Sequence, residues 1–138
     1  MQELKDRIVK EGKVLPGNII KVDGFLNHRI DTELMDHIAE EFGKHFNMDE
    51  VTVILTAEAS GIALSAVVAH HFHKPMIFAK KAKSDNIEGG LYQSDIFSYT
   101  YKKKVTLLVS KEWLRAEDKV LIIDDFMANG EAMRGLCD

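Results

Sequence analysis

The apolar positions of the first eleven residues are spaced as in an amphipathic helix. Leu4, Ile8 and Val9 fall on one stripe of a helical surface, and Gly12 supplies a stop after them. The apolar stretch that follows, residues 13–30, is interrupted by proline and glycine. We therefore expect a short helix first, and then short strands and a loop instead of another long element.

A longer helical periodicity begins at Asp31 and Thr32, two residues that can cap the amino terminus of a helix. The acids Glu33 and Asp36 lie near the positive end of this segment, where the helix dipole favours negative charge. The pattern predicts an amphipathic helix with one face against the core. Its apolar stripe consists of Leu34, Met35, Ile38, Phe42 and Phe46.

Three short apolar runs later in the chain predict strands. The run VTVILTA, from Val51, is β-branched and lacks polar alternation, as expected of a strand covered on both faces. Residues 60–72 follow it with a helical pattern, and PMIFA, from Pro75, is a second strand that completes a βαβ crossover. The run KVLIIDDF, residues 119–126, predicts a third strand.

The segment between the second and third strands has a different character. It begins polar and contains glycine, and then residues 92–99 and 105–109 are rich in aromatic and β-branched side chains. This order predicts a mobile loop followed by an antiparallel hairpin. No repeat, low-complexity tract or linker divides the chain, so we expect a single α/β domain over residues 1–138, with an open, mainly parallel sheet flanked by helices.

Composition and charge narrow the classes of protein that fit this pattern. The 138 residues, 46% apolar and 29% charged, are enough for one hydrophobic core. The net charge of -4, with acids and bases interspersed, offers no broad basic face, so nucleic acid is not an expected partner. The single cysteine cannot form an internal disulfide, and no apolar run approaches the ~20 residues that span a bilayer. We therefore expect a cytoplasmic protein without a membrane partner.

The third predicted strand ends in two adjacent acids, Asp124 and Asp125, and the turn Ala128-Asn129-Gly130 follows them. Open parallel sheets bind ligands at the carboxyl ends of their strands, and this turn opens a helix whose first amides suit a phosphate. The acids can accept hydrogen bonds from hydroxyls, so the two features together indicate a sugar phosphate. An acidic strand end with an ordinary Asn-Gly turn explains either feature alone. The segment TAEASG, residues 56–61, is a second strand end of this kind.

Known nucleotide motifs separate the candidate ligands. The chain has neither G-x-x-x-x-G-K-[ST] nor G-x-G-x-x-G, so ATP and NAD are not favoured. A run of aliphatic residues, two acids, two further residues and Ala-x-Gly instead resembles the 5-phosphoribosyl-1-pyrophosphate signature of the type I phosphoribosyltransferases.

Three further segments resemble the xanthine branch of that family. Residues 19–31, IIKVDGFLNHRID, are similar to a motif near the family's amino terminus, residues 58–62 to its Glu-Ser-Ser-Gly-Ile loop, and residues 78–84 to its FARKHKS segment. Their order and spacing are kept along the whole chain. Two departures are Ala59, where a serine is usual, and Lys80, where an arginine is common.

The resemblance implies the type I phosphoribosyltransferase fold and a reaction in purine salvage. A homodimer would transfer ribose 5-phosphate from 5-phosphoribosyl-1-pyrophosphate to xanthine, giving xanthosine 5'-monophosphate and pyrophosphate, with Mg²⁺ carried by the donor. Two alternatives stay open: a transcriptional regulator of the same fold that senses the donor, and an enzyme specific for adenine or guanine. Family members are longer than this chain, which implies that carboxyl-terminal strands and a base-stacking residue are missing. The 138-residue chain is therefore expected to be less stable and less active than a family-length version.

The resemblance also assigns a role to individual residues, and none of them is a protein ligand to metal. Carboxylates below the ribose stabilise the positive charge that develops on the ring when pyrophosphate leaves. By this resemblance, Asp124 and Asp125 would bind the ribose hydroxyls as catalytic residues, and the 5-phosphate would be bound by Ala128, Asn129, Gly130, Glu131 and Ala132. The pyrophosphate would be bound by Glu58, Ala59, Ser60 and Gly61, and the base by Ile20 and Asn27. Lys80 and Lys81 would make further contacts with the donor.

Other chemically capable residues receive structural interpretations. Three histidines near a helix end have no acid or cysteine near them in sequence, so the helix dipole explains them better than a metal does. A cysteine without a neighbouring base is not an expected nucleophile, and a lone tryptophan is an expected packing anchor. A lysine run is an expected solvated strand edge. These residues are His70, His71 and His73, then Cys137, Trp113, and residues 102–104.

Overall fold

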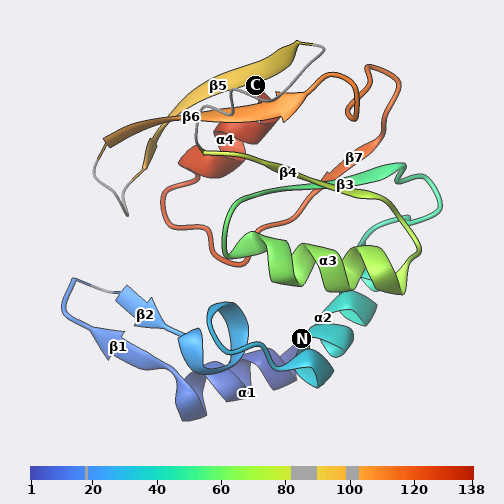
Figure 1. Cartoon of the computed structure of the whole chain (residues 1–138). Helices are drawn as coiled ribbons and strands as arrows, with labels where there is room; N and C mark the ends of the chain where they lie inside the picture. Colours follow the sequence, from blue (N-terminus) through green and yellow to red (C-terminus); the bar gives the residue numbers. More distant parts are fainter. Residues whose placement is uncertain (18, 82–89, 99–102) are drawn as a thin grey trace.

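The computed structural model describes residues 1–17, 19–81, 90–98 and 103–138, arranged around a small parallel sheet (Figure 1). No helix in these ranges is long and apolar enough to cross a membrane. In chain order the elements are α1 (Gln2–Glu11), β1 (Lys13–Leu15), β2 (Ile19–Lys21), the π-helical turn η1 (Asp23–Asn27), α2 (Thr32–His45), β3 (Val53–Ala57), α3 (Gly61–His71), β4 (Met76–Ala79), β5 (Leu91–Ser98), β6 (Lys103–Ser110), β7 (Val120–Ile122) and α4 (Glu131–Cys137).

The central sheet contains the three strands that the apolar runs predicted. Its order is β4-β3-β7, and both pairings are parallel. All five residues of β3 are buried, which confirms the expectation of a strand covered on both faces. Strand β7 therefore lies beside β3 on the side away from β4, although β4 precedes β7 in the chain.

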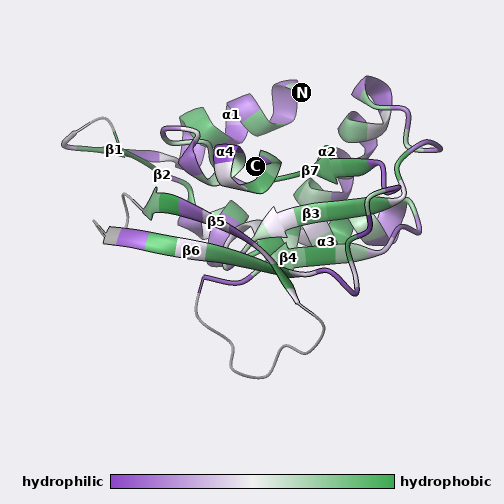
Figure 2. Ribbon diagram, turned by 90° about the horizontal axis from the view of Figure 1, so that it is seen from above, coloured by the Kyte–Doolittle hydropathy of each residue, from purple (hydrophilic) through white to green (hydrophobic). Residues whose placement is uncertain are grey.

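Each face of the sheet carries its own apolar cluster. In Figure 1, α2 and α3 lie on one side of the sheet, whereas α4 and the β5–β6 hairpin lie on the other. Ile54 packs in the cluster with the first pair of helices, and its neighbour Leu55 packs in the cluster with the hairpin. Successive residues of a strand point to opposite faces, so one strand contributes to both clusters. Figure 2 shows β3 and β4 as mostly hydrophobic.

The long predicted helix is confirmed as α2, with its expected cap. The Asp31 carboxylate accepts a hydrogen bond from the Leu34 backbone N–H at 3.2 Å. The helix ends at His45, so Phe46, the last member of the predicted apolar stripe, is the C-terminal cap and is 45% exposed. Its ring stacks on that of Phe42, with ring centroids 5.9 Å apart.

The amino-terminal region agrees with the sequence in outline and differs in two details. Helix α1 packs through Leu4 and Ile8, but Val9 is 86% exposed, so the predicted stripe is wrong at that position. Helix α1 touches the core along a narrow line, and Val9 lies outside it. Strands β1 and β2 are the expected short strands, and they pair antiparallel. The turn η1 was not predicted, and it buries Phe25 and Leu26 in the core.

The predicted hairpin is confirmed as β5 and β6, which pair antiparallel along their whole lengths. A bridge between Lys80 and Leu108 links β6 to the end of β4. The loop that was expected to be mobile falls on residues 82–89, which lie outside the described residues. Of the lysine run, Lys104 is exposed on β6, and Lys102 lies outside the described residues.

Trp113 is not a packing anchor, because 66% of it is exposed. It lies in the turn after β6, where the inward position is taken by the next residue. Leu114 packs against the apolar cluster between the sheet and the hairpin.

Helix α4 approaches the hairpin closely through Gly135. A Cβ on this glycine would lie 2.3 Å from the Cγ2 of Ile96 and 3.1 Å from a methyl of Leu107. We expect Gly135→Ala to lower the free energy of unfolding by about 1 to 2 kcal/mol, because overpacking against a β-branched side chain exceeds the ~1 kcal/mol gained in helix propensity. Urea unfolding monitored by circular dichroism measures the change.

The matched control for this variant is Gly24→Ala. A Cβ on Gly24 meets no atom within 4 Å, so its effect should stay within about 0.5 kcal/mol. Equal stabilities for the two variants would mean that α4 does not depend on this close approach.

Candidate functional site

The carboxyl ends of β3 and β7 meet at one edge of the sheet. The two strands are parallel neighbours, so the segments that follow them, residues 58–61 and 123–130, leave the sheet side by side. The backbone N–H of Ile123 donates to the carbonyl of Leu55 at 2.9 Å and holds the end of β7 against β3. The two strand ends that sequence reasoning selected are therefore brought together.

Asp125 joins three separate segments of the chain. One carboxylate oxygen accepts a hydrogen bond from the Ser60 hydroxyl at 2.8 Å, and the other accepts one from the side-chain amide of Asn27 at 2.9 Å. Asn27 ends η1, Ser60 precedes α3, and Asp125 follows β7. Three of the predicted site residues thus form one hydrogen-bonded cluster.

Asp124 has a different environment from its neighbour. It is half-buried, and its Oδ1 accepts a hydrogen bond from the backbone N–H of Asp125 at 2.9 Å. Burial, followed by the adjacent Asp125 carboxyl group, raises the pKa of Asp124 to about 6. The positive charge of Lys81 acts in the opposite direction. Asp125 is therefore bound by two hydrogen-bond donors, and Asp124 has a raised pKa.

Gly61 allows Asp124 to sit close to β3. A Cβ at this position would lie 2.3 Å from the Oγ1 of Thr56 and 2.7 Å from the Oδ1 of Asp124. Any side chain at residue 61 would therefore push these two oxygen atoms away. Thr56 is fully buried, and sequence analysis treated it only as a part of the strand. A hydroxyl in an otherwise apolar run was the signal that could have identified it.

Glu58 contacts the end of β4. Its carboxylate accepts a hydrogen bond from the backbone N–H of Lys81 at 2.5 Å, and its own N–H donates to Ala79 O at 3.0 Å. The Glu58–Ala59 peptide bond is cis. The first of these contacts holds the backbone of Lys81 against Glu58.

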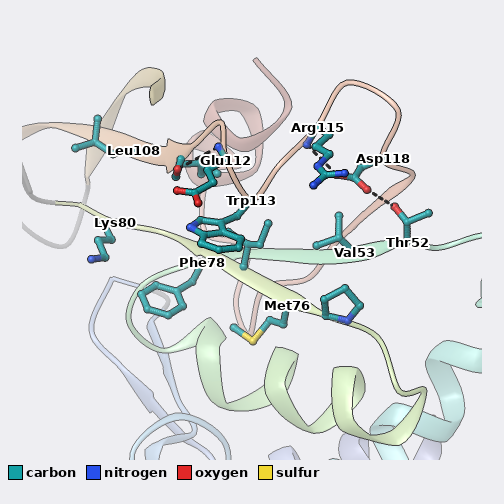
Figure 3. A pocket seen from close by; sticks show the side chains of 14 residues that line it. Thr52, Val53, Met76, Phe78, Lys80, Leu108, Glu112, Trp113, Arg115 and Asp118 are labelled. Atoms are coloured by element: carbon teal, nitrogen blue, oxygen red, sulfur yellow. Dashed lines mark hydrogen bonds between the residues drawn. The ribbon is translucent and has the colours of Figure 1, made fainter. Parts of the chain in front are cut away.

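Lys80 and Lys81 diverge from each other. The backbone of Lys80 exchanges two hydrogen bonds with Leu108, at 3.0 and 2.9 Å, and its side chain is exposed. It lines a hollow of about 1040 Å³ together with Phe78 and Trp113 (Figure 3). The Asp pair does not line this hollow. Of the two predicted lysines, Lys80 therefore lines this separate hollow, whereas the charge of Lys81 acts on Asp124.

One rim of this hollow is fixed by Asp118. Its carboxylate accepts from the Thr52 hydroxyl and from the Arg115 backbone N–H, both at 2.8 Å (Figure 3). Hydrogen bonding by the Arg115 N–H and then by the Thr52 hydroxyl lowers the pKa of Asp118. The rim is a structural feature of the loop between β6 and β7.

The turn before α4 presents open backbone. Gly130 has a φ of 75°, in the left-handed region, and a Cβ placed there meets no atom within 4 Å. Ala128 and Asn129 are exposed before it, and Ala132 packs against the hairpin cluster. A phosphate could reach the backbone of this turn without a steric obstacle.

Glu131 is an acid in the turn that was predicted to hold a phosphate, and its side chain is engaged elsewhere. Its carboxylate pairs with Arg134 at 3.2 Å and accepts from the Phe97 backbone N–H at 3.3 Å. The Arg134 guanidinium, followed by the Phe97 N–H, lowers the pKa of Glu131. The negative charge is therefore neutralised on the hairpin side, which leaves the backbone of residue 131 for an anion.

The remaining candidates lie outside this cluster. Ile20 lies on β2, opposite Val14, and is 41% exposed. In the described part of the chain, no three His, Cys, Asp or Glu side chains are grouped to hold a metal ion. Cys137 is an exposed free cysteine, and the histidines near residue 71 end α3, as expected.

Comparison with curated proteins identifies the family. No family model matches the chain. The chain is 53% identical over 138 residues to the xanthine phosphoribosyltransferase of Lachnoclostridium phytofermentans, covering 100% of this chain and 71% of that protein. It is 50% identical over 139 residues to that of Bifidobacterium animalis subsp. lactis, covering 100% and 72%. The chain belongs to the xanthine phosphoribosyltransferase family.

Solved structures confirm the type I phosphoribosyltransferase fold. The APRTase of Giardia lamblia, complexed with 9-deazaadenine, superposes with a TM-score of 0.77 at 22% identity and covers 95% of this chain and 72% of that one. The adenine phosphoribosyltransferase of Saccharomyces cerevisiae superposes with a TM-score of 0.75 at 15% identity and covers 99% and 80%. At these identities the likeness is one of fold.

The raised pKa of Asp124 makes the stability of the protein depend on pH. The folded protein binds the proton near pH 6 and the unfolded chain near 3.8, so the free energy of unfolding falls as the pH rises between these values. Asp124→Asn removes the buried charge. We expect this variant to be more stable than the parent at pH 8 by on the order of 1 kcal/mol, after allowance for solvent screening. Urea unfolding across this pH range measures the difference.

The control is Asp49→Asn, the same change at an exposed carboxylate. It removes one negative charge from an exposed site, so it measures the general effect of this charge change over the same pH range. If the advantage of Asp124→Asn over the parent stayed constant between about pH 4 and pH 8, Asp124 would not have a raised pKa.

Proposed function

We propose that the protein is a cytoplasmic purine salvage enzyme that converts xanthine and 5-phosphoribosyl-1-pyrophosphate to xanthosine 5'-monophosphate and pyrophosphate. The observation that carries this proposal is the identity of 47 to 53% to several proteins named xanthine phosphoribosyltransferase, each covering the whole chain. A homodimer is proposed as the working form, as the family resemblance implies.

The chemistry requires stabilisation of a positive charge. The bond between the anomeric carbon and the pyrophosphate oxygen breaks, a bond to a xanthine nitrogen forms, and the ribose ring carries positive charge in between. Asp124 and Asp125 are proposed to bind the ribose hydroxyls and to stabilise this charge. With a pKa of about 6, Asp124 is mostly ionised at neutral pH.

The donor is proposed to bind along the edge formed by β3 and β7. The 5-phosphate would bind to backbone amides of Ala128 to Ala132, which the open turn at Gly130 favours. The pyrophosphate would bind to the segment from Glu58 to Gly61, with Lys81 close by. Mg²⁺ would arrive on the pyrophosphate, whose oxygens are ligands it prefers, and would neutralise the leaving group.

The xanthine base is proposed to bind next to η1, where the predicted residues are Asn27 and Ile20. The hydrogen bond from Asn27 to Asp125 supports this assignment, because it joins the base side of the site to the ribose side. The exposure of Ile20 on β2 leaves its side chain available for an apolar contact. Lys80 remains a predicted donor contact and lines the separate hollow.

The two alternative functions have less support. The solved adenine phosphoribosyltransferases are 15 to 22% identical to this chain, and such identities carry no information on the base. No described observation favours a regulator over an enzyme. A purine panel with xanthine, guanine, hypoxanthine and adenine, assayed with the donor and Mg²⁺, tests the proposed substrate directly, and a preference for another base would overturn it.

The negative charges of the acid pair should be required for the reaction. Asp124→Asn and Asp125→Asn should each lower kcat for xanthine by on the order of 10²-fold, because each removes a negative charge from below the ribose. Steady-state assays of release of pyrophosphate measure the loss, and circular dichroism checks the fold. The chain spans 71% of the Lachnoclostridium phytofermentans protein, so the same variants are also made in a chimera extended by the remainder of that protein.

Asp49→Asn is again the matched control and should keep parental activity. Near-parental kcat for both site variants would assign the acid pair a structural role and refute this part of the proposal.

The open backbone of the turn at Gly130 should be required for binding of the donor. Gly130→Val should weaken binding of the Mg²⁺ complex of the donor by about tenfold or more, because valine disfavours a φ of 75° and shields the backbone. Binding of free xanthine should be spared. Isothermal titration calorimetry measures both affinities.

Gly17→Val provides the control for backbone strain. Gly17 also has a positive φ, of 86°, and open space around it, but it lies in the β1–β2 turn. An equal loss of donor affinity in both variants would show that strain, and not the phosphate site, explains the effect.

A further inference from the structure

Thr56 carries a buried hydroxyl without a partner. Its residue exposure is 0%, and its Oγ1 makes no hydrogen bond to any of the described residues. Ser65, also fully buried, does donate, to Ile123 O at 3.5 Å. An unpaired buried hydroxyl costs about 1 to 3 kcal/mol, and a valine of nearly the same shape would avoid that cost. The group therefore requires a physical explanation.

The surroundings of Thr56 point to Asp124. The point where Gly61 would carry a Cβ lies 2.3 Å from Thr56 Oγ1 and 2.7 Å from Asp124 Oδ1, so the two oxygens flank the same spot. A methyl group does not fit between these two oxygen atoms. The Asp124 carboxylate lies at the same spot as Thr56, and it can accept a hydrogen bond from the Thr56 hydroxyl.

The Asp124 carboxylate has the freedom to complete this contact. Its Oδ1 accepts only the Asp125 N–H among the described contacts, at 2.9 Å. The terminal torsion of an aspartate is broad, so a small rotation costs little. A ribose hydroxyl that donates to the other carboxylate oxygen of Asp124, Oδ2, would favour a rotation of this kind.

We propose that Thr56 is a positioning residue for Asp124, whose hydroxyl donates to the Asp124 carboxylate when the ribose of the donor is bound and fixes that carboxylate below the sugar ring. This inference rests on the proposed function, in which Asp124 contacts the ribose. Gly61 is also required in this proposal, because the absence of a side chain there lets Thr56 Oγ1 and Asp124 Oδ1 approach each other. A group fixed before the reaction stabilises a developing charge without a reorganisation cost.

Two comparisons isolate the effect of the Thr56 hydroxyl: the parent with Thr56→Val, and Thr56→Ser with Thr56→Ala. Thr56→Val removes it and keeps the shape, so we expect kcat to fall by about tenfold while KM for the donor changes by less than about twofold. Thr56→Ser keeps the hydroxyl and should retain kcat within about twofold of the parent. Thr56→Ala differs from Thr56→Ser by one oxygen atom and should lose kcat as the valine variant does, which preserves the test if Thr56→Val does not fold.

A purely structural threonine gives the opposite pattern. In that case Thr56→Val keeps kcat and gains stability in urea, and Thr56→Ser and Thr56→Ala lose stability with equal kcat. That result overturns the inference and leaves the proposed function intact. An absence of xanthine ribosylation in the parent chain and in its extended chimera would overturn the proposed function and this inference with it.

Discussion

The parallel pairing of β3 with β7 is the constraint on which the site depends. The register of Leu55 with Ile122 fixes where each strand ends, and the next residues of both strands leave the sheet at the same edge. Ser60 and Asp125, 65 residues apart in the chain, then lie within one hydrogen bond of each other. A shift of one residue would turn Asp124 to the other face of the sheet.

The sheet tolerates two adjacent acids because their environments differ. Asp125 accepts hydrogen bonds from Asn27 and Ser60. Asp124 is half-buried beside it, and burial raises its pKa. The two neighbouring carboxylates therefore differ, because one is bound by two hydrogen-bond donors and the other has a raised pKa.

Close packing at two glycines sets the positions of the covering helices. Gly61 brings the start of α3 against Thr56 and Asp124, and Gly135 brings α4 against Ile96. A larger side chain at either position would displace a helix from the sheet. The site therefore depends on small residues whose contribution is the space that they leave.

The sequence by itself determined the elements, because hydrophobic periodicity and turn residues are local properties. It correctly indicated α2, the three parallel strands and the hairpin, and it selected both strand ends that form the cluster. It did not predict η1 or the exposure of Val9 and Trp113, because burial depends on which neighbour arrives from a distant part of the chain. Tertiary structure alone decided that Asn27 binds Asp125, that Lys80 lines a hollow away from the Asp pair, and that the buried Thr56 hydroxyl and Asp124 flank Gly61. These contacts join residues that are far apart in sequence or that face opposite sides of one strand, and no local pattern encodes them.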